Sequence, residues 1–172
     1  KRLTLLTGSE VDIMNDGSLD YPDDVLAALD VVVASIHTGF SQDEATLTRR
    51  IITAMRNPYV TIIAHPTGRL MGEREPYAVN LDAVFKAAKA TGTALEINSY
   101  PRRLDLNDAA ARRANELGVM FAISTDSHST DQLENVTFGL GVARRAWVEP
   151  RRVLNCLTLK QLRQWTARKR HT

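Results

Sequence analysis

Five residues that can bind metal ions each follow a short apolar segment of the sequence. They are two carboxylates and three imidazoles: Glu10, His37, His65, Asp126 and His128. The apolar segments are typical of buried strands in a parallel sheet, whose carboxyl ends meet at one edge, where ligands gather. A single histidine at a strand end is usually a packed residue. Three of them in register with two acids are expected to converge on one site.

Imidazole and carboxylate ligands together favour Zn²⁺, Mn²⁺ or Fe²⁺ over Mg²⁺ or Ca²⁺. A carboxylate can bridge two such ions. The ion pair would lower the pKa of bound water and stabilise the attacking and leaving oxygens of a phosphoryl displacement. Asp126 and His128 are two residues apart and would face opposite ways on an extended strand. Both can be ligands only if the chain bends between them.

Arg69 lies in the loop that follows His65. A guanidinium at this position can hold a substrate phosphate through two hydrogen bonds, which would make Arg69 a catalytic residue. The alternative is a surface arginine in a glycine-containing turn.

The elements that would position these residues alternate between strands and helices, which predicts an α/β fold with a parallel sheet. The expected strands cover residues 3–8, 31–36, 60–64, 94–98 and 119–124. A capping pattern of Ser41 and Glu44 predicts a helix over 41–56. Further helices are expected over 81–91 and 107–117, which stop at glycines, over 151–157, and over 159–168, with Trp165 on the apolar side.

The 172 residues fit one domain, 1–172, and contain no apolar run long enough to cross a membrane. The single cysteine, Cys156, excludes an internal disulfide, favours a cytoplasmic location and is expected to be buried. The net charge is only +2, but residues 139–172 contain nine Lys or Arg and one acid, Glu149. This basic end could approach nucleic-acid phosphates or form a solvated helix face.

Several motifs together resemble the polymerase and histidinol phosphatase (PHP) superfamily. They are Gly8-Ser9-Glu10-Val11-Asp12, Ala34-Ser35-Ile36-His37, Ala64-His65-Pro66-Thr67-Gly68-Arg69, Leu95-Glu96-Ile97-Asn98 and Ser124-Thr125-Asp126-Ser127-His128-Ser129. Other stretches resemble the C-terminal PHP domain of bacterial family X DNA polymerases. These are Asp16-Gly17-Ser18-Leu19-Asp20-Tyr21-Pro22, Arg74-Glu75-Pro76-Tyr77 and the segment from Phe138 to Trp147.

The resemblance implies a distorted (β/α)7 barrel with three metal ions, typically Mn²⁺, and hydrolysis of phosphodiesters at DNA 3′ ends. It implies that Glu10 bridges two metals, that Asp126 joins it on the first and that His128 binds the third. His37 and His65 would bind the second. Glu96 and Asn98 match a family motif and are expected to line or support the site.

The family also places a His-x-His strand and two further ligands before the position of Glu10, and this sequence has none there. His171, near the C-terminus, is not expected to replace them. The sequence therefore predicts a C-terminal portion of the domain, with about five of nine ligands and roughly five of seven strands. Such a fragment is expected to be weakly active or inactive and prone to self-association.

Two other functions stay open at this point. One is a small-molecule phosphatase of the histidinol-phosphatase type, which would use the same metals. The other is a non-catalytic module that supports the polymerase domains of the same parent chain.

Overall fold

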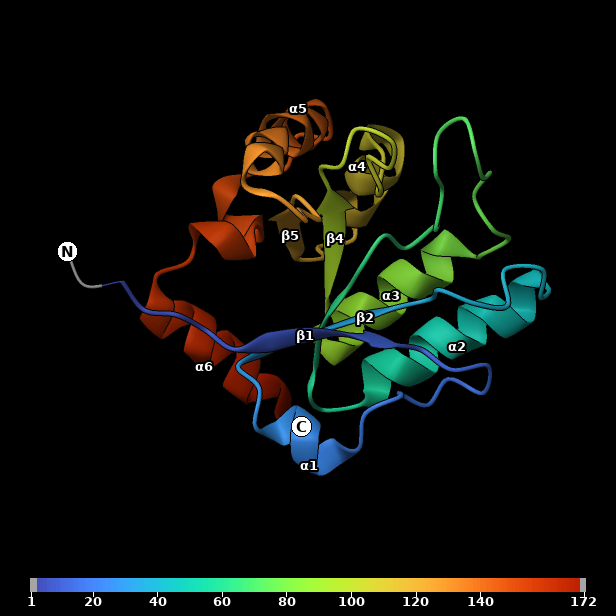
Figure 1. Cartoon of the computed structure of the whole chain (residues 1–172), viewed down its shortest axis with the longest axis horizontal. Helices are drawn as coiled ribbons and strands as arrows, with labels where there is room; N and C mark the ends of the chain where they lie inside the picture. Colours follow the sequence, from blue (N-terminus) through green and yellow to red (C-terminus); the bar gives the residue numbers. More distant parts are fainter. Residues whose placement is uncertain (1–2, 171–172) are drawn as a thin grey trace.

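The structure, a computed structural model, describes residues 3–170 and contains a five-stranded parallel sheet (Figure 1). The strands are β1 (Gly8–Asp12), β2 (Val31–Ser35), β3 (Val60–Ile63), β4 (Ala94–Asn98) and β5 (Phe121–Ser124). They lie side by side in the order of the sequence. With right-handed crossovers, this order puts the connecting helices on one face, as in an α/β barrel. The predicted α/β class is confirmed, and the sheet is compatible with a partial distorted PHP barrel.

Three of the helices begin next to a side chain that accepts a hydrogen bond from their first turn. The helices are α1 (Asp23–Ala27), α2 (Glu44–Arg56), α3 (Leu81–Thr91), α4 (Asp108–Glu116), α5 (Val136–Arg145) and α6 (Leu159–Arg170). The predicted Ser41 cap is wrong. The Asp43 side chain accepts the hydrogen bond from Thr46 N, and the helix begins at Glu44, three residues after the predicted start. The predicted end of α3 is confirmed: Gly92 has the left-handed backbone that terminates a helix.

The two faces of the sheet carry different side chains, because successive residues of a strand point to opposite sides. The outer face packs against the helices through residues such as Val11, Ala34 and Ile97. Among these helices, α2 and α3 lie side by side (Figure 1). On the concave face, Ala94 and Ala122 pack with apolar residues of α6 that include Leu162 and Trp165, so Trp165 is on the apolar side as predicted. Helix α6 therefore covers the amino-terminal half of the concave face and leaves the carboxyl-terminal half for polar residues.

The first predicted strand is wrong in its position. Residues 3–7 are not part of the sheet, and the side chains of Leu3 and Leu5 are exposed. Pairing begins where Gly8 lies opposite Val31 and ends at Asp12. Glu10 therefore lies inside β1 and not after its end, as the sequence had suggested.

The predicted helix over 151–157 is also wrong. Two single 3-10 turns replace it, η2 (Pro150–Arg152) and η3 (Leu154–Cys156). Another 3-10 turn, η1 (Thr130–Asn135), leads into α5. Because η3 is a single turn, it directs only Leu154 into the core and leaves Cys156 exposed. The predicted burial of Cys156 is therefore wrong.

Part of the basic C-terminal segment is used inside the fold. Lys169 Nζ donates hydrogen bonds to Val60 O and to Thr93 Oγ1, and Arg170 Nη2 donates to Leu29 O. These acceptors lie at or just before the amino ends of β2, β3 and β4, so this end of α6 is held at the sheet edge opposite the predicted site. His171 falls outside the described residues. None of the described helices is both long and apolar enough to cross a membrane.

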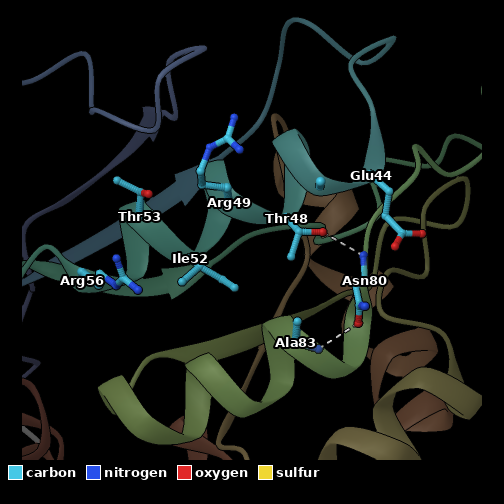
Figure 2. A pocket seen from close by; sticks show the side chains of 9 residues that line it. Glu44, Thr48, Arg49, Ile52, Thr53, Arg56, Asn80 and Ala83 are labelled. Atoms are coloured by element: carbon cyan, nitrogen blue, oxygen red, sulfur yellow. Dashed lines mark hydrogen bonds between the residues drawn. The ribbon is translucent and has the colours of Figure 1, made fainter.

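A groove between α2 and α3 contains none of the predicted site residues (Figure 2). Asn80 joins the two helices there, because its backbone N–H donates to Thr48 Oγ1 at 2.9 Å while its side chain caps α3 through Ala83 N at 3.0 Å. The groove thus reflects how α3 is attached to α2.

Candidate metal centre

Strand β1 presents two carboxylates on the concave face of the sheet. Glu10 and Asp12 flank the fully buried Val11, whose side chain packs on the other face. In the sheet register, Glu10 lies opposite Val33 and Asp12 lies opposite Ser35. Because His37 follows Ser35 by two residues, both carboxylates are close to the imidazole that comes after β2.

Glu10, His37 and His65 form a compact cluster. The Oε1 atom of Glu10 lies 3.1 Å from Nε2 of His65 and 3.5 Å from Nε2 of His37. The three ligand atoms are within 4.8 Å of one another, and the two ring centroids are 5.3 Å apart. The His65 side chain is only 3% exposed, whereas 41% of the His37 side chain is exposed. The cluster can hold a metal ion that protein encloses on the side of His65 and that solvent can reach on the side of His37.

Asp12 supports this cluster, and the sequence reasoning missed it. Its Oδ1 atom lies 2.6 Å from Nδ1 of His37, the ring nitrogen that does not face Glu10. A carboxylate at this position orients the imidazole and makes it a better ligand. The signal was present in the sequence, since residues two apart on a strand share a face and Asp12 is two residues beyond Glu10.

The charges of the cluster shift the pKa values of its members. Hydrogen bonds from His37 and His65 hold the pKa of Glu10 well below its usual range. The Glu10 carboxylate, followed by Asp12, raises the pKa of His37 to about 9, although burial acts in the opposite direction. The raised pKa favours the doubly protonated form of the metal-free His37 ring, and a metal ion that binds Nε2 must displace the proton there.

A buried polar network lies beneath the cluster. Glu96 is 5% exposed and accepts hydrogen bonds from the backbone N–H of His65 at 2.6 Å and from the Ser124 hydroxyl. Asn98 Nδ2 donates to Glu96 Oε2 at 3.3 Å and to Asp126 Oδ2 at 3.2 Å. Burial raises the pKa of Glu96. The network connects the loop of His65 with the loop of Asp126, in keeping with the supporting role expected for Glu96 and Asn98.

The structure places Asp126 at the same edge of the sheet but outside the compact cluster. Its backbone has a φ of 52°, so the bend predicted between Asp126 and His128 is present. His128 is exposed, and its Nδ1 atom lies 2.9 Å from the carbonyl oxygen of Asp126. Neither residue belongs to the group of ligand atoms around Glu10. Their roles as ligands stay predictions.

Arg69 contacts the chain that follows β4. Its Nε atom donates to Arg103 O at 2.6 Å and its Nη2 atom to Leu104 O at 2.5 Å. The side chain of Arg103, in turn, lies with Nε 3.3 Å from Oδ2 of Asp126. Arg69 thus supports a loop that carries a second arginine to the site. Its own role as a phosphate clamp stays a prediction.

The sequence of the chain is similar to those of known enzymes. No protein-family model matches the chain. The chain is 46% identical over 164 residues to the DNA polymerase/3′-5′ exonuclease PolX of Bacillus subtilis (strain 168), which covers 95% of this chain and 29% of the polymerase. It is 34% identical over 161 residues to a probable phosphatase of Thermoanaerobacter sp. (strain X514), which covers 88% of this chain and 63% of the phosphatase. The chain therefore spans less than two thirds of the length of each relative.

Proposed function

Because the chain belongs to the PHP family and fits the PHP domain of a family X DNA polymerase, we propose that it is a metal-dependent phosphoesterase for phosphodiesters at DNA 3′ ends. The observation that carries the proposal is the convergence of the Glu10, His37 and His65 ligand atoms at the carboxyl edge of the parallel sheet. Ligands and catalytic groups gather at that edge in α/β folds.

The donor set fits a divalent transition metal. One carboxylate oxygen and two imidazole nitrogens suit Mn²⁺, Zn²⁺ or Fe²⁺. Asp126 and His128 are the other two proposed ligands of this chain, and the ligand set of a full domain would hold up to three ions. Bound ions of this kind supply a nucleophilic water at neutral pH and stabilise charge on phosphate oxygens.

The residues of this chain would orient both the ligands and the substrate. Asp12 holds His37 so that its Nε2 atom faces Glu10. Glu96 fixes the backbone of His65 from below the site. Arg69 is the proposed clamp for the substrate phosphate, and a guanidinium can bind two phosphate oxygens at once.

We extend the proposal to the parent protein. Residues 1–172 would form the C-terminal portion of one PHP domain, attached to polymerase domains in the same chain. The domain would act on DNA 3′ ends as a 3′-5′ exonuclease or 3′-end processing activity. The polymerase relative supports this assignment, since it matches nearly all of this chain and is named as a polymerase and an exonuclease.

A labelled DNA duplex with a recessed 3′ end tests the proposal. With Mn²⁺, the chain should shorten the recessed strand slowly, as expected of a site with only part of its ligands. Glu10→Gln should lower this rate by at least about tenfold because it weakens the metal ligand set. Glu116→Gln, which removes a carboxylate on the outer helix α4, should have no effect. Equal rates for Glu10→Gln and the unmodified chain would contradict the proposal.

A second candidate function is hydrolysis of small phosphate monoesters. The probable phosphatase relatives favour it, since one is 34% identical over 88% of this chain. The same preparations can be compared on the DNA duplex and on p-nitrophenyl phosphate. Faster hydrolysis of the monoester, with loss in Glu10→Gln, would favour this second function over the first.

A further inference from the structure

Arg50 is a charged side chain in the interior of the protein. It lies on α2, is 1% exposed and donates hydrogen bonds only to uncharged acceptors. Its Nε atom donates to Met14 O at 2.9 Å and its Nη2 atom to Ile13 O at 2.6 Å. Its Nη1 atom donates to Thr38 O at 3.1 Å and to Gln42 Oε1 at 2.7 Å. Within residues 3–170, no carboxylate forms an ion pair with it.

Stability alone does not account for this residue. Removing a guanidinium from water without a carboxylate partner is expensive, and an apolar side chain of similar volume would usually be at least as stable. What distinguishes arginine is a rigid, planar group with five donors, which can bind several carbonyl oxygens in a fixed arrangement. Arg50 is therefore suited to hold backbone segments in one relative position.

The segments that Arg50 holds are those that carry Asp12 and His37. Ile13 directly follows Asp12, and Thr38 directly follows His37. One guanidinium thus joins two strand ends whose side chains meet at 2.6 Å. Two of the three carbonyl oxygens that Arg50 binds, those of Ile13 and Thr38, are therefore one residue from a member of the pair.

The turn after β1 completes this arrangement. The backbone N–H of Asp12 donates to Asp20 Oδ1 at 2.9 Å, and Asp20 N donates to Asp12 O at 3.1 Å. Within the turn, Asp16 Oδ1 accepts from the backbone N–H and the hydroxyl of Ser18. The Asp16–Asp20 segment therefore fixes the backbone of Asp12 itself, and Arg50 fixes the residues that follow.

We propose that Arg50 is a positioning residue of the metal centre, which sets the contact between Asp12 and His37 and thereby directs Nε2 of His37 toward Glu10. The inference rests on the proposed metal site and adds a residue of helix α2 that controls the geometry of that site. It also gives the Asp16–Asp20 turn a role, as the second attachment of Asp12.

Two measurements on the full chain test this inference. The first is the ¹⁵N NMR spectrum of the His37 ring without metal, which reports whether the proton on Nδ1 is hydrogen-bonded. The second is Mn²⁺ affinity, measured by titration calorimetry. Arg50→Lys retains the charge but not the fork of donors. It should lose the Nδ1 hydrogen-bond signature and bind Mn²⁺ about 10–100-fold more weakly.

A matched variant separates positioning from general destabilisation. Val84→Ala creates a small cavity in the outer core on α3, where the side chain is fully buried. It should lower stability while leaving the His37 spectrum and the Mn²⁺ affinity unchanged. If Arg50→Lys behaves like Val84→Ala, the positioning role is wrong.

Gln42→Leu provides a milder variant in case Arg50→Lys does not fold. It removes the one side-chain acceptor of Arg50 and should weaken the His37 Nδ1 hydrogen-bond signal, whereas an unchanged spectrum would overturn the inference. If the unmodified chain binds no Mn²⁺, the proposed function fails. The metal-free spectra then still decide the role of Arg50.

Discussion

The Oδ1 atom of Asp12 lies 2.6 Å from Nδ1 of His37, and the opposite nitrogen of the same ring faces Glu10. A strand residue and a loop residue, 25 positions apart, thus form a carboxylate–imidazole pair beside the candidate ligands. In metal sites, such a pair fixes the ring orientation and the tautomer of the ligand. The first two predictions depend on this contact.

Asp12→Asn should weaken Mn²⁺ binding by about 10–100-fold, because the amide is a poorer acceptor and raises the ligand strength of His37 less. Titration calorimetry at constant pH measures the effect. Glu116→Gln, an exposed change on α4, is the control and should bind Mn²⁺ like the unmodified chain. Unaltered affinity in Asp12→Asn would show that the contact does not support a metal site.

The His37 ring should titrate with a pKa of about 9 in the metal-free protein, as measured by NMR. Glu10→Gln should lower this pKa more than Asp12→Asn does, since the Glu10 contact is the larger cause. The folded-state pKa is raised above the ordinary 6.5, so the stabilisation from His37 is present in full below about pH 6.5. It should be lost as the pH rises toward 9. A pKa near 6.5 in the folded protein would contradict the observed contacts.

Glu96→Leu should destabilise the fold by about 1–3 kcal/mol, because it leaves the buried backbone N–H of His65 without its acceptor. Glu96→Gln retains a carbonyl oxygen for that N–H and should cost less. Urea unfolding of the two variants measures the difference. Equal stability of Glu96→Leu and the unmodified chain would mean that the His65 N–H finds another partner.

Two glycines of α5 provide a matched pair of substitutions. A methyl group on Gly139 would collide with Ser99 Oγ and come within 2.9 Å of Ile123 Cγ2, so Gly139→Ala should cost about 1–3 kcal/mol. A methyl group on Gly141 would meet nothing within 4 Å, and Gly141→Ala should stabilise the helix by about 0.5–1 kcal/mol. Thermal unfolding of both variants checks the contrast. The same sign of change in both would contradict the packing described for α5.

Most of the fold was predictable because four of the five strands contain a short apolar run and several helices between them carry clear end signals. Asn107 and Gly118, for example, flank α4 as the sequence suggested. The first strand was misplaced because Leu3 and Leu5 look like strand residues but have no neighbour to pair with in the described structure. Pairing partners decide where a strand begins, and they are not visible in a local pattern.

The candidate site was predictable to the extent that its proposed histidine ligands follow strands. His37 and His65 meet Glu10 as their positions implied. Asp12 was missed because a carboxylate beside a proposed ligand has no distinguishing local signal until the neighbouring strand places His37 against it. Arg50 was missed for a related reason, since a helical arginine is usually solvent-exposed. Only tertiary packing reveals that it is buried.

The consecutive strand order has a consequence for how the chain assembles. Each strand pairs with the one made just before it, so the sheet can grow one strand at a time as the polypeptide emerges from the ribosome. Helix α6 is the exception: Lys169 reaches back 109 residues to Val60, and Arg170 reaches back 141 residues to Leu29. Closing such long loops comes late in folding. The amino-terminal half of the concave face, which α6 covers, is therefore the last part of the sheet to be covered. Its apolar side chains are exposed longest during synthesis.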